Sequence, residues 1–288
     1  MTASNRMPER VARFYGNVDF ALDTIANRQL TFIHVSKLND PFDPYFFFDT
    51  QFNERYDAVV SYVSVNHPND FGWFINAVPP ENWNATIRNL KDYLERMRQS
   101  TFMFSTSGIS SNKHLRDNLH MWGHYGNGHR GVLIEFDMGE LMECAKSANE
   151  SASKKTNYVD DIFMKVEYKE SIPLLTPRDI FLFYKSITIG IDNPTVVERY
   201  LNNTLRIKSA DWKNENEWRM LWHNDETRLK VHHMRISEAS IKKVYIGFNM
   251  TKTNSKDVEF ETRRRFPNAQ IIFAKRTPGA FGLEFMTA

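Results

Sequence analysis

Three histidines crowd one short segment of the sequence, DNLHMWGHYGNGHRGVLIEFD at residues 117–137. His120 and His124 are four residues apart, so on a helix they would share one face, as in the zinc sites built on H-E-x-x-H. The glutamate that serves as general base in those sites is missing here, and Gly123 weakens the helix. His129 would complete a metal site only if the turn that carries it folds back.

The same segment carries two aromatic residues, Trp122 and Tyr125, which are three apart. Side chains at this spacing lie on one face of a helix. The favoured interpretation is therefore that Trp122 and Tyr125 form an aromatic wall, either of a ligand site or of the core. The histidines would then lie at the edge of this wall and modify its polarity. We expect no bound metal.

A pair of glutamates separated by one residue stands in ADWKNENEWRMLW, residues 210–222. In a strand, Glu215 and Glu217 would point to the same face. Two carboxylates on one face repel unless they meet a cation, a hydroxyl or a shared proton, and this is one origin of catalytic carboxylates. The alternative is an exposed strand or a helix start in which they pair with Arg219.

Two short polar motifs precede these glutamates in the chain. In LNDPFDP, residues 38–44, the side chains of Asn39, Asp40 and Asp43 can bond the amides of their own turn, which favours a structural turn. The alternative is that side chains of this turn reach a ligand pocket. In FSTS, residues 104–107, a strand ends in three consecutive hydroxyl residues.

Composition limits the class of protein only broadly. The 288 residues are 41% hydrophobic and carry a net charge of +2, which gives no basic footprint for nucleic acid. Cys144 is the one cysteine, so neither an internal disulfide nor a thiolate zinc cluster can form. The N-terminal residues lack the apolar stretch of a signal peptide, and no apolar run is long enough for a membrane helix. We expect a soluble cytoplasmic protein with no membrane contact.

The elements that must position these residues mix helices and strands along the whole length. Apolar residues at steps of three and four predict an amphipathic helix from Trp83. Compact apolar runs predict strands at TFMFSTS, GVLIEFD, KKVYIGF and QIIFAKR. The fold class predicted is α+β, with a mixed, mainly antiparallel sheet and helical insertions. We expect residues 1–288 to form a single domain in which about 138–205 are a helical insertion or lid.

The order of the motifs LNDPFD, FS, MWGHYGNGHRGVLIEFD, KSADWKNENEWR and KKVYIGF resembles a widespread bacterial family of uncharacterised proteins. The resemblance runs from about residue 13 to residue 277, which is nearly the whole chain. It implies no activity.

A looser resemblance concerns the arginine-class ADP-ribosyltransferases, which carry an arginine on the first strand, an aromatic-Ser-Thr-Ser strand and a late Glu-x-Glu. The matching positions here are Arg13, Ser105, Glu215 and Glu217. The resemblance implies that NAD is the substrate, that Arg13 holds an NAD phosphate and that Ser105 positions the nicotinamide ribose. It implies that Glu217 stabilises the positive charge of the ribose in the transition state. Glu215 would orient or activate the acceptor.

The resemblance also implies what surrounds the substrate. Trp122 or Tyr125 would stack on the nicotinamide, with His124 as a polar neighbour, and Asn39 and Asp40 would reach the pocket from their turn. The long gap between the two motifs requires an insertion at about 138–205.

Three functions stay open at this point. The first is an NAD-consuming enzyme, either a glycohydrolase or a transferase that modifies a protein or nucleic acid. Such an enzyme would be a toxin or phage-defence effector with an antitoxin or defence-system partner. It requires Arg13, Ser105 and Glu217 to converge in a cleft lined by aromatic residues. The second is a nuclease or other hydrolase that uses the three histidines. The third is a non-catalytic binding module, with both glutamates exposed or paired with lysine or arginine.

Overall fold

The computed structural model describes residues 7–38, 40, 43, 55–109, 115–151, 163–171, 176–189, 204–223 and 231–288. The chain divides into two compact units. Unit 1 takes residues 1–34, 102–166 and 213–288, and unit 2 takes residues 35–101 and 167–212. Among the residues described in both units, no helix is both long and apolar enough to cross a membrane.

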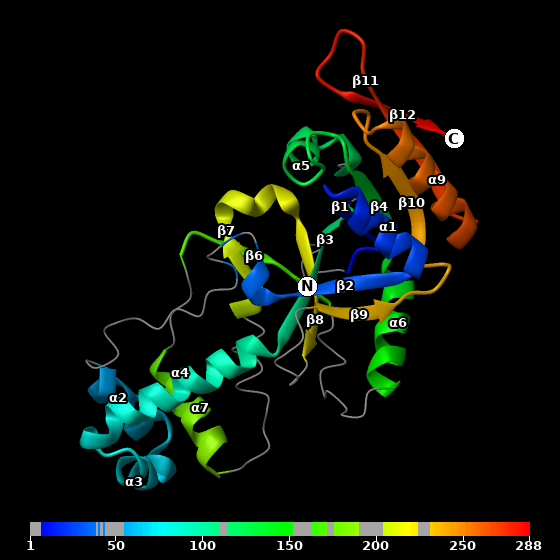
Figure 1. Ribbon diagram of the computed structural model, residues 1–288. Helices are drawn as coiled ribbons and strands as arrows, with labels where there is room; N and C mark the ends of the chain where they lie inside the picture. Colours follow the sequence, from blue (N-terminus) through cyan, green and yellow to red (C-terminus); the bar gives the residue numbers. More distant parts are fainter. Residues whose placement is uncertain are drawn as a thin grey trace. The chain divides into compact units, whose positions relative to one another are not determined.

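Unit 1 is built on a sheet of ten described strands (Figure 1). They are β1 (Arg10–Tyr15), β2 (Gln29–His34), β3 (Thr101–Gly108), β4 (Val132–Asp137), β5 (Phe163–Lys165), β8 (Glu217–His223), β9 (Val231–Arg235), β10 (Ile241–Ile246), β11 (Gln270–Arg276) and β12 (Leu283–Thr287). The order is β12-β11-β10-β4-β1-β3-β2-β9, and β8 pairs with β3 and β5. β10 and β11 run parallel, whereas β4 is antiparallel to both of its neighbours, β1 and β10.

Strand β3 has three partners, and this decides where a site can form. β1 pairs with the C-terminal end of β3, through Val11 and Ala12. β2 pairs with its N-terminal end, through Ile33 and His34. The sheet therefore passes from β1 to β2 along the length of β3, and Arg13 is the first residue of β1 beyond the β1–β3 register.

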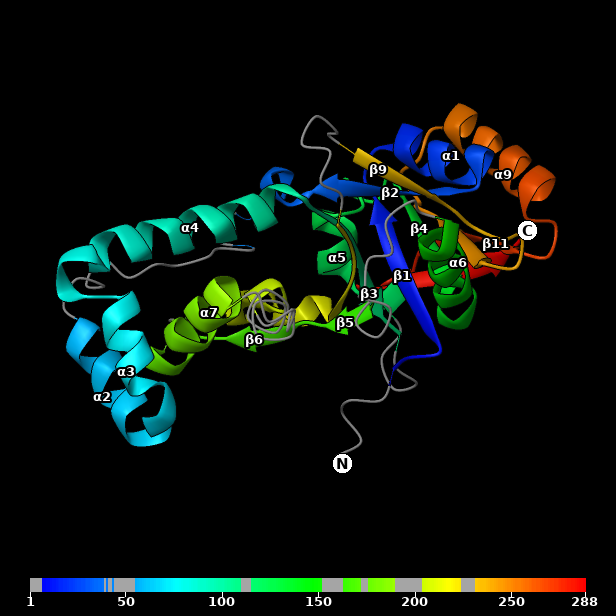
Figure 2. The same ribbon diagram turned by 90° about the horizontal axis from the view of Figure 1, so that it is seen from below.

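Helices cover both faces of this sheet. They are α1 (Val18–Asn27), α5 (Leu119–His124), α6 (Met138–Ser151) and α9 (Lys252–Arg265), with the short 3-10 helix η5 (Leu115–Asp117) before α5. α1 and α9 lie side by side on one face, in both ribbon views (Figures 1 and 2). Together with α6 they close the main core of unit 1, whereas α5 packs on the opposite face.

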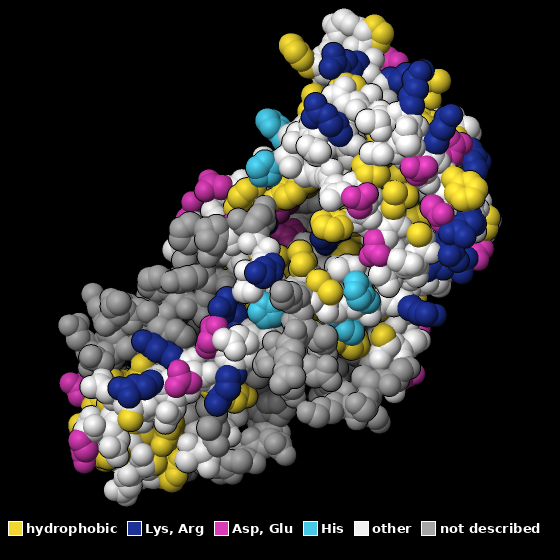
Figure 3. Space-filling model, viewed as in Figure 1, with side chains coloured by type: hydrophobic (Ala, Val, Ile, Leu, Met, Phe, Trp, Pro, Cys, Tyr) yellow, Lys and Arg dark blue, Asp and Glu magenta, His cyan; other side chains and the backbone are white. Residues whose placement is uncertain are grey.

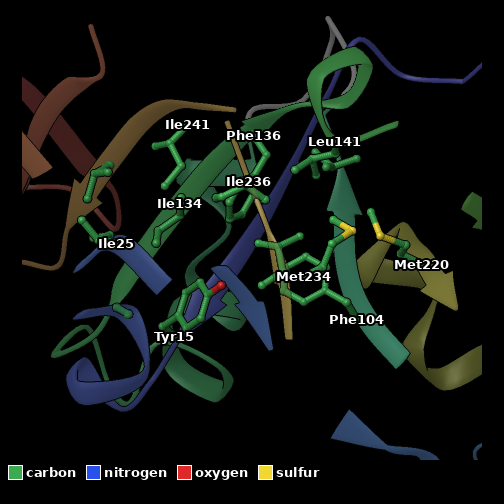
Figure 4. Packing of buried hydrophobic residues seen from close by; sticks show 14 of the residues in the cluster. Tyr15, Ile25, Phe104, Ile134, Phe136, Leu141, Met220, Met234, Ile236 and Ile241 are labelled. Carbon is green, nitrogen blue, oxygen red and sulfur yellow. The ribbon is translucent and has the colours of Figure 1, made fainter. Parts of the chain in front are cut away.

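The main core is formed by side chains from distant parts of the chain (Figure 4). Tyr15, Phe104 and Ile134 come from three neighbouring strands, and Leu141 from α6. Each fully buried side chain of this size contributes about 1.5–3 kcal/mol by leaving water. This core fixes the strands that carry the candidate site.

Unit 2 has its own core. Its described elements are α2 (Tyr56–Asn66), α3 (Pro68–Ala77), α4 (Trp83–Gln99), α7 (Pro177–Ile189), the 3-10 helices η2 (Val35–Lys37) and η4 (Pro80–Asn82), and the parallel pair β6 (Glu167–Lys169) and β7 (Ile207–Ser209). The 3-10 helix η7 (Ala210–Glu215) spans the boundary and leads into β8. The helix predicted from Trp83 is α4, and it buries Trp83, Ile87, Leu90 and Leu94 as its spacing requires.

The predicted α+β class is confirmed, with a sheet that is mixed and mainly antiparallel. The four strands expected from compact apolar runs are β3, β4, β10 and β11. The expected insertion at about 138–205 overlaps unit 2 from residue 167 onward, while α6 and β5 lie in unit 1. Unit 2 also draws residues 35–101 from earlier in the chain.

Candidate functional site

Arg13 lies where β1 leaves β3, and its side chain occupies that point. Nη1 donates a hydrogen bond of 2.9 Å to the backbone carbonyl of Ser105. In a continued β1–β3 ladder this carbonyl would face the backbone of β1, so the guanidinium replaces a strand partner. Arg13 and Ser105, which are 92 residues apart, are thus brought together.

The guanidinium of Arg13 is set among aromatic rings. Its Cζ lies 4.6 Å from the ring centre of Phe104 and 5.5 Å from that of Tyr15. Burial lowers the pKa of Arg13, and the nearby Tyr15 and Glu217 act in the opposite direction. The charge of Glu217, the third expected residue, therefore acts on the guanidinium of Arg13.

Glu217 opens β8 and is buried, with 5% of its surface exposed. Its carboxylate accepts two hydrogen bonds from Arg219, whose Nε lies 2.9 Å from Oε1 and whose Nη2 lies 3.2 Å from Oε2. Arg219 is fully buried. The two residues alternate along one strand, so both side chains point to the same face. An arginine partner is what the non-catalytic reading expects for a glutamate, and the pairing matches it for Glu217.

Glu215 has a different neighbour. The Tyr125 hydroxyl donates a hydrogen bond to Oε1 of Glu215, which is 6% exposed. Tyr125 follows α5, whose N-cap is Asn118. The helix therefore delivers a hydroxyl to the first glutamate of the pair.

The expectation that both glutamates lie on one strand face is wrong. Glu215 ends the 3-10 helix η7, and β8 begins only at Glu217. Asn216 between them has a φ of +46°, a left-handed conformation that asparagine tolerates better than most residues. Its Nδ2 donates to the carbonyl of Gly108 at 2.8 Å, and the Gly108 amide donates back to the Asn216 carbonyl at 2.8 Å. The turn is locked against the end of β3.

The Ser-Thr-Ser run on β3 contributes one backbone carbonyl and one hydroxyl to the described side-chain contacts. Ser105 is half-buried and offers its carbonyl to Arg13. Thr106 is buried and donates its hydroxyl to the carbonyl of Trp218 at 3.0 Å, which ties β3 to β8. Ser107 is also buried.

Trp122 lies in the core and has no exposed surface. Its ring meets Phe14 edge to face at 5.0 Å and stacks on His129 at 5.7 Å, and its Nε1 donates to the Arg116 carbonyl at 2.7 Å. Of the two readings of the helix, the core reading therefore describes Trp122. Tyr125 is the aromatic residue that reaches the glutamates.

The three histidines of this segment have separate surroundings. His120 and His124 are exposed, and the His124 ring meets Tyr125 edge to face at 5.0 Å. His129 packs against Trp122 and Phe248, and burial, followed by the charge of Arg276, lowers its pKa. Among the described residues, no three side chains of His, Cys, Asp or Glu are grouped so that they could hold a metal ion.

The turn LNDPFDP belongs to unit 2, and Asn39 lies outside the described residues. Asp40 and Asp43 are buried, and the amide of Asp43 donates to the carbonyl of Asp40 at 3.1 Å, which is the bond of a tight turn. Within the same unit, Oδ2 of Asp43 lies 3.7 Å from Nζ of the buried Lys208. The favoured structural reading agrees with these contacts.

Arg219 is the residue whose part in the site went unrecognised in the sequence, where it stood only as a surface partner. Alternation along β8 was the available signal, because a residue two positions from Glu217 shares its face. Figure 3 shows that the face of unit 1 below α5 is hollowed, with acidic side chains within the hollow.

Comparison with known proteins gives one match. A family model described as "Protein of unknown function (DUF2971)" matches residues 121–220. The chain matches no curated protein and no solved structure. The matched segment contains Tyr125, Glu215, Glu217 and Arg219, while Arg13 and Ser105 precede it. The chain thus shares the part that carries both glutamates and their partners with a family of uncharacterised proteins.

Proposed function

We propose that this protein cleaves the bond between nicotinamide and ribose in NAD, as an ADP-ribosyltransferase-like enzyme or an NAD glycohydrolase. The observation that supports the proposal is the contact of Arg13 with Ser105, two residues that lie on different strands and are 92 positions apart. The Arg13–Ser105 hydrogen bond and the electrostatic effect of Glu217 on Arg13 both support it.

Glu217 is suited to the charge that this reaction develops. As nicotinamide leaves, positive charge grows on the ribose, and a fixed carboxylate in a water-poor site stabilises it. Arg219 holds the carboxylate by one hydrogen bond to each oxygen. A carboxylate has about four lone-pair positions, and the two bonds from Arg219 take two of them and fix the direction of the Glu217 carboxylate. Arginine pairing, which the non-catalytic reading expects, is therefore compatible with catalysis.

Arg13 is suited to the diphosphate of the substrate. A guanidinium carries five N–H donors in a planar fork that matches phosphate oxygens. One hydrogen bond, to the Ser105 carbonyl, fixes the fork, and the Phe104 ring supports its face. A preoriented cation of this kind loses little entropy when it binds an anion.

Consumption of NAD would act on the whole metabolism of a cell, and this consequence underlies the proposed role as a toxin or defence effector in the cytoplasm. A neutralising antitoxin or a defence-system partner belongs to the same proposal. The acceptor of the ADP-ribosyl group is a protein, a nucleic acid or water.

The test is nicotinamide release from NAD by the purified chain, compared with Glu217→Gln. We expect release that the substitution abolishes, because glutamine keeps the shape but removes the charge. Glu143→Gln is the matched control, since Glu143 is an exposed residue of α6 paired with Lys146. If the wild-type chain releases no nicotinamide even when cell lysate supplies acceptors, the proposal is wrong.

A further inference from the structure

Three loops meet at one end of the sheet of unit 1. Residues 126–131 precede β4, residues 247–251 follow β10, and residues 277–282 follow β11. Because β4 is antiparallel to β10 and β10 is parallel to β11, the start of β4 lies beside the ends of the other two strands. The first two loops are also joined directly, since the amide of Asn249 donates to the carbonyl of His129 at 2.9 Å. The three loops therefore belong to one surface.

This loop surface, formed by residues 126–131, 247–252 and 275–282, is basic. The three segments contain no aspartate or glutamate, and their cationic residues are Arg130, Lys252, Lys275 and Arg276. All four residues are exposed, and none of them forms an ion pair with a carboxylate in the part of the chain that the structure describes. In Figure 3, Lys and Arg side chains lie over the β11–β12 hairpin that Figure 1 labels. The net charge of +2 for the whole chain does not reveal this local excess, which fits an anionic partner.

The guanidinium of Arg276 is oriented by an aromatic ring. Its Cζ lies 4.8 Å from the ring centre of Phe248, which in turn lies 4.6 Å from that of His129. Contact with a ring face restrains the guanidinium, while its edge keeps N–H donors that match phosphate oxygens. Arg130 follows His129 in the chain, so a second guanidinium is carried by the loop that packs against Phe248. Both cations are suited to phosphate groups.

An aromatic side chain, that of Phe281, projects from the same surface. It lies at the tip of the β11–β12 hairpin and has a relative exposure of 103%. The amide of Thr277 donates to the carbonyl of Gly282 at 3.1 Å and closes this hairpin, so the ring is carried by a defined turn. A flat nucleobase can stack on an open ring face, whereas an apolar peptide side chain would need a concave pocket for its burial. Phe281 therefore favours a partner with planar bases.

We propose that the loop surface binds single-stranded nucleic acid. Its four cations contact the phosphates of the backbone, and Phe281 stacks on a base. A basic surface combined with an aromatic platform is how proteins bind single strands without sequence preference. In a duplex the base faces are covered by neighbouring bases, so Phe281 would find no face to stack on. This binding goes beyond the proposed cleavage of NAD and does not depend on it.

The first experiment measures binding of the full chain to fluorescein-labelled oligo-dT and oligo-U by fluorescence anisotropy. We expect a Kd of about 1–100 μM or lower with at least one of them, and the tighter of the two distinguishes DNA from RNA as the source of the strand. A DNA duplex of equal length should bind at least about fivefold more weakly. Absence of binding, equal affinity for the duplex, or equal competition by polyglutamate would overturn the proposal. None of these outcomes depends on whether NAD is cleaved.

The second experiment tests the cations with a control of equal charge. In Arg130→Gln/Arg276→Gln, the slope of log Kd against log salt concentration should fall by about 1.4, because each phosphate contact to a single strand contributes about 0.7. Arg263→Gln/Arg264→Gln removes the same charge at the other end of α9, where both arginines are paired with glutamates. This control should keep the wild-type slope. Equal slopes in the two double variants would place the strand elsewhere on the protein.

The third experiment tests the aromatic platform. Phe281→Ala should raise Kd about fivefold to a hundredfold, the equivalent of one lost base stack, and leave the salt slope unchanged. Phe20→Ala is the matched control, since Phe20 on α1 is also exposed, at 67%. An unchanged Kd in Phe281→Ala, or an equal loss in Phe20→Ala, would refute stacking on the hairpin. Thermal unfolding verifies that all variants are folded, which their exposed positions lead us to expect.

Discussion

The guanidinium of Arg219 donates a hydrogen bond to each oxygen of the Glu217 carboxylate, at 2.9 Å and 3.2 Å. Both side chains are buried: that of Arg219 is 0% exposed and that of Glu217 is 6% exposed. Burial of two charges is costly, and the cost is offset only while both remain together. The pair therefore links the stability of β8 to the orientation of the carboxylate that we assign to catalysis.

Arg219→Met is expected to destabilise the fold by about 3–5 kcal/mol, because it leaves Glu217 charged, buried and without this cation. The double variant Glu217→Gln/Arg219→Met should recover part of that loss, since no charge is then stranded. Urea unfolding of the wild type, both single variants and the double variant measures the coupling. Strictly additive effects would show that the two residues do not stabilise one another.

Arg13→Lys keeps a positive charge but loses the planar fork that bonds the Ser105 carbonyl and faces Phe104. We expect KM for NAD to rise about tenfold to a hundredfold, the equivalent of one charge-assisted hydrogen bond. The control is Arg263→Lys, an exposed arginine of α9 paired with Glu259. Steady-state nicotinamide release gives both constants, and an unchanged KM in Arg13→Lys would remove this residue from the phosphate site.

His232 gives the protein an acid-sensitive contact in β9. Its ring stacks on Trp222 at 4.2 Å, and burial, followed by the neighbouring His233, lowers its pKa to about 4. The unfolded chain binds this proton near pH 6.5, so the stability contributed by neutral His232 is present above pH 6.5 and lost as the pH falls toward 4.

We expect the wild type to lose about 1–2 kcal/mol more than His232→Phe between pH 7 and pH 4.5, a figure reduced for partial exposure. Phenylalanine keeps the stacking partner of Trp222 but cannot be protonated. The exposed His120 serves as control, and His120→Phe should follow the wild type. Identical pH dependence of the wild type and His232→Phe in urea unfolding would contradict the expectation.

Two glycines of the histidine segment should respond in opposite ways to alanine. A Cβ on Gly131 would lie 2.1 Å from the backbone carbonyl oxygen of Tyr15, whereas a Cβ on Gly123 in α5 would meet nothing within 4 Å. Gly131→Ala must displace β1 or β4 and should cost about 2 kcal/mol or more. Gly123→Ala should be neutral or stabilise by up to about 1 kcal/mol. Thermal unfolding of both variants measures the two changes in stability. Equal melting temperatures would contradict the close approach of β1 and β4.

Periodicity predicted the elements well where one local pattern governs burial. The spacing from Trp83 describes α4, and the apolar run GVLIEFD describes the central strand β4. In both segments the residues that the pattern marks as apolar are those that the fold buries. Such patterns depend on neighbours within a few positions, which a sequence displays directly.

The site was harder to predict because its geometry depends on single backbone angles and distant contacts. One left-handed residue, Asn216, separates two glutamates that alternation would place on one face. The place of Arg13 depends on where β1 leaves β3, and the partner of Glu215 is the residue that follows α5, 90 residues earlier in the chain. Composition and local spacing do not determine such backbone angles or contacts between residues far apart in the sequence.

At each point where the chain passes from unit 1 to unit 2, it comes back to unit 1 on a neighbouring strand. The chain leaves after His34 and re-enters at Phe102, and these two residues lie opposite each other in the β2–β3 ladder. It leaves again after Val166 and returns at Lys213, where the amide of Val166 donates to the carbonyl of Glu217 at 3.0 Å. Each excursion thus begins and ends on adjacent strands, a gap that a short loop can close. The register of the β2–β3 and β5–β8 ladders is therefore set by pairing within unit 1, and both segments of unit 2 are inserted between strands that pair with each other.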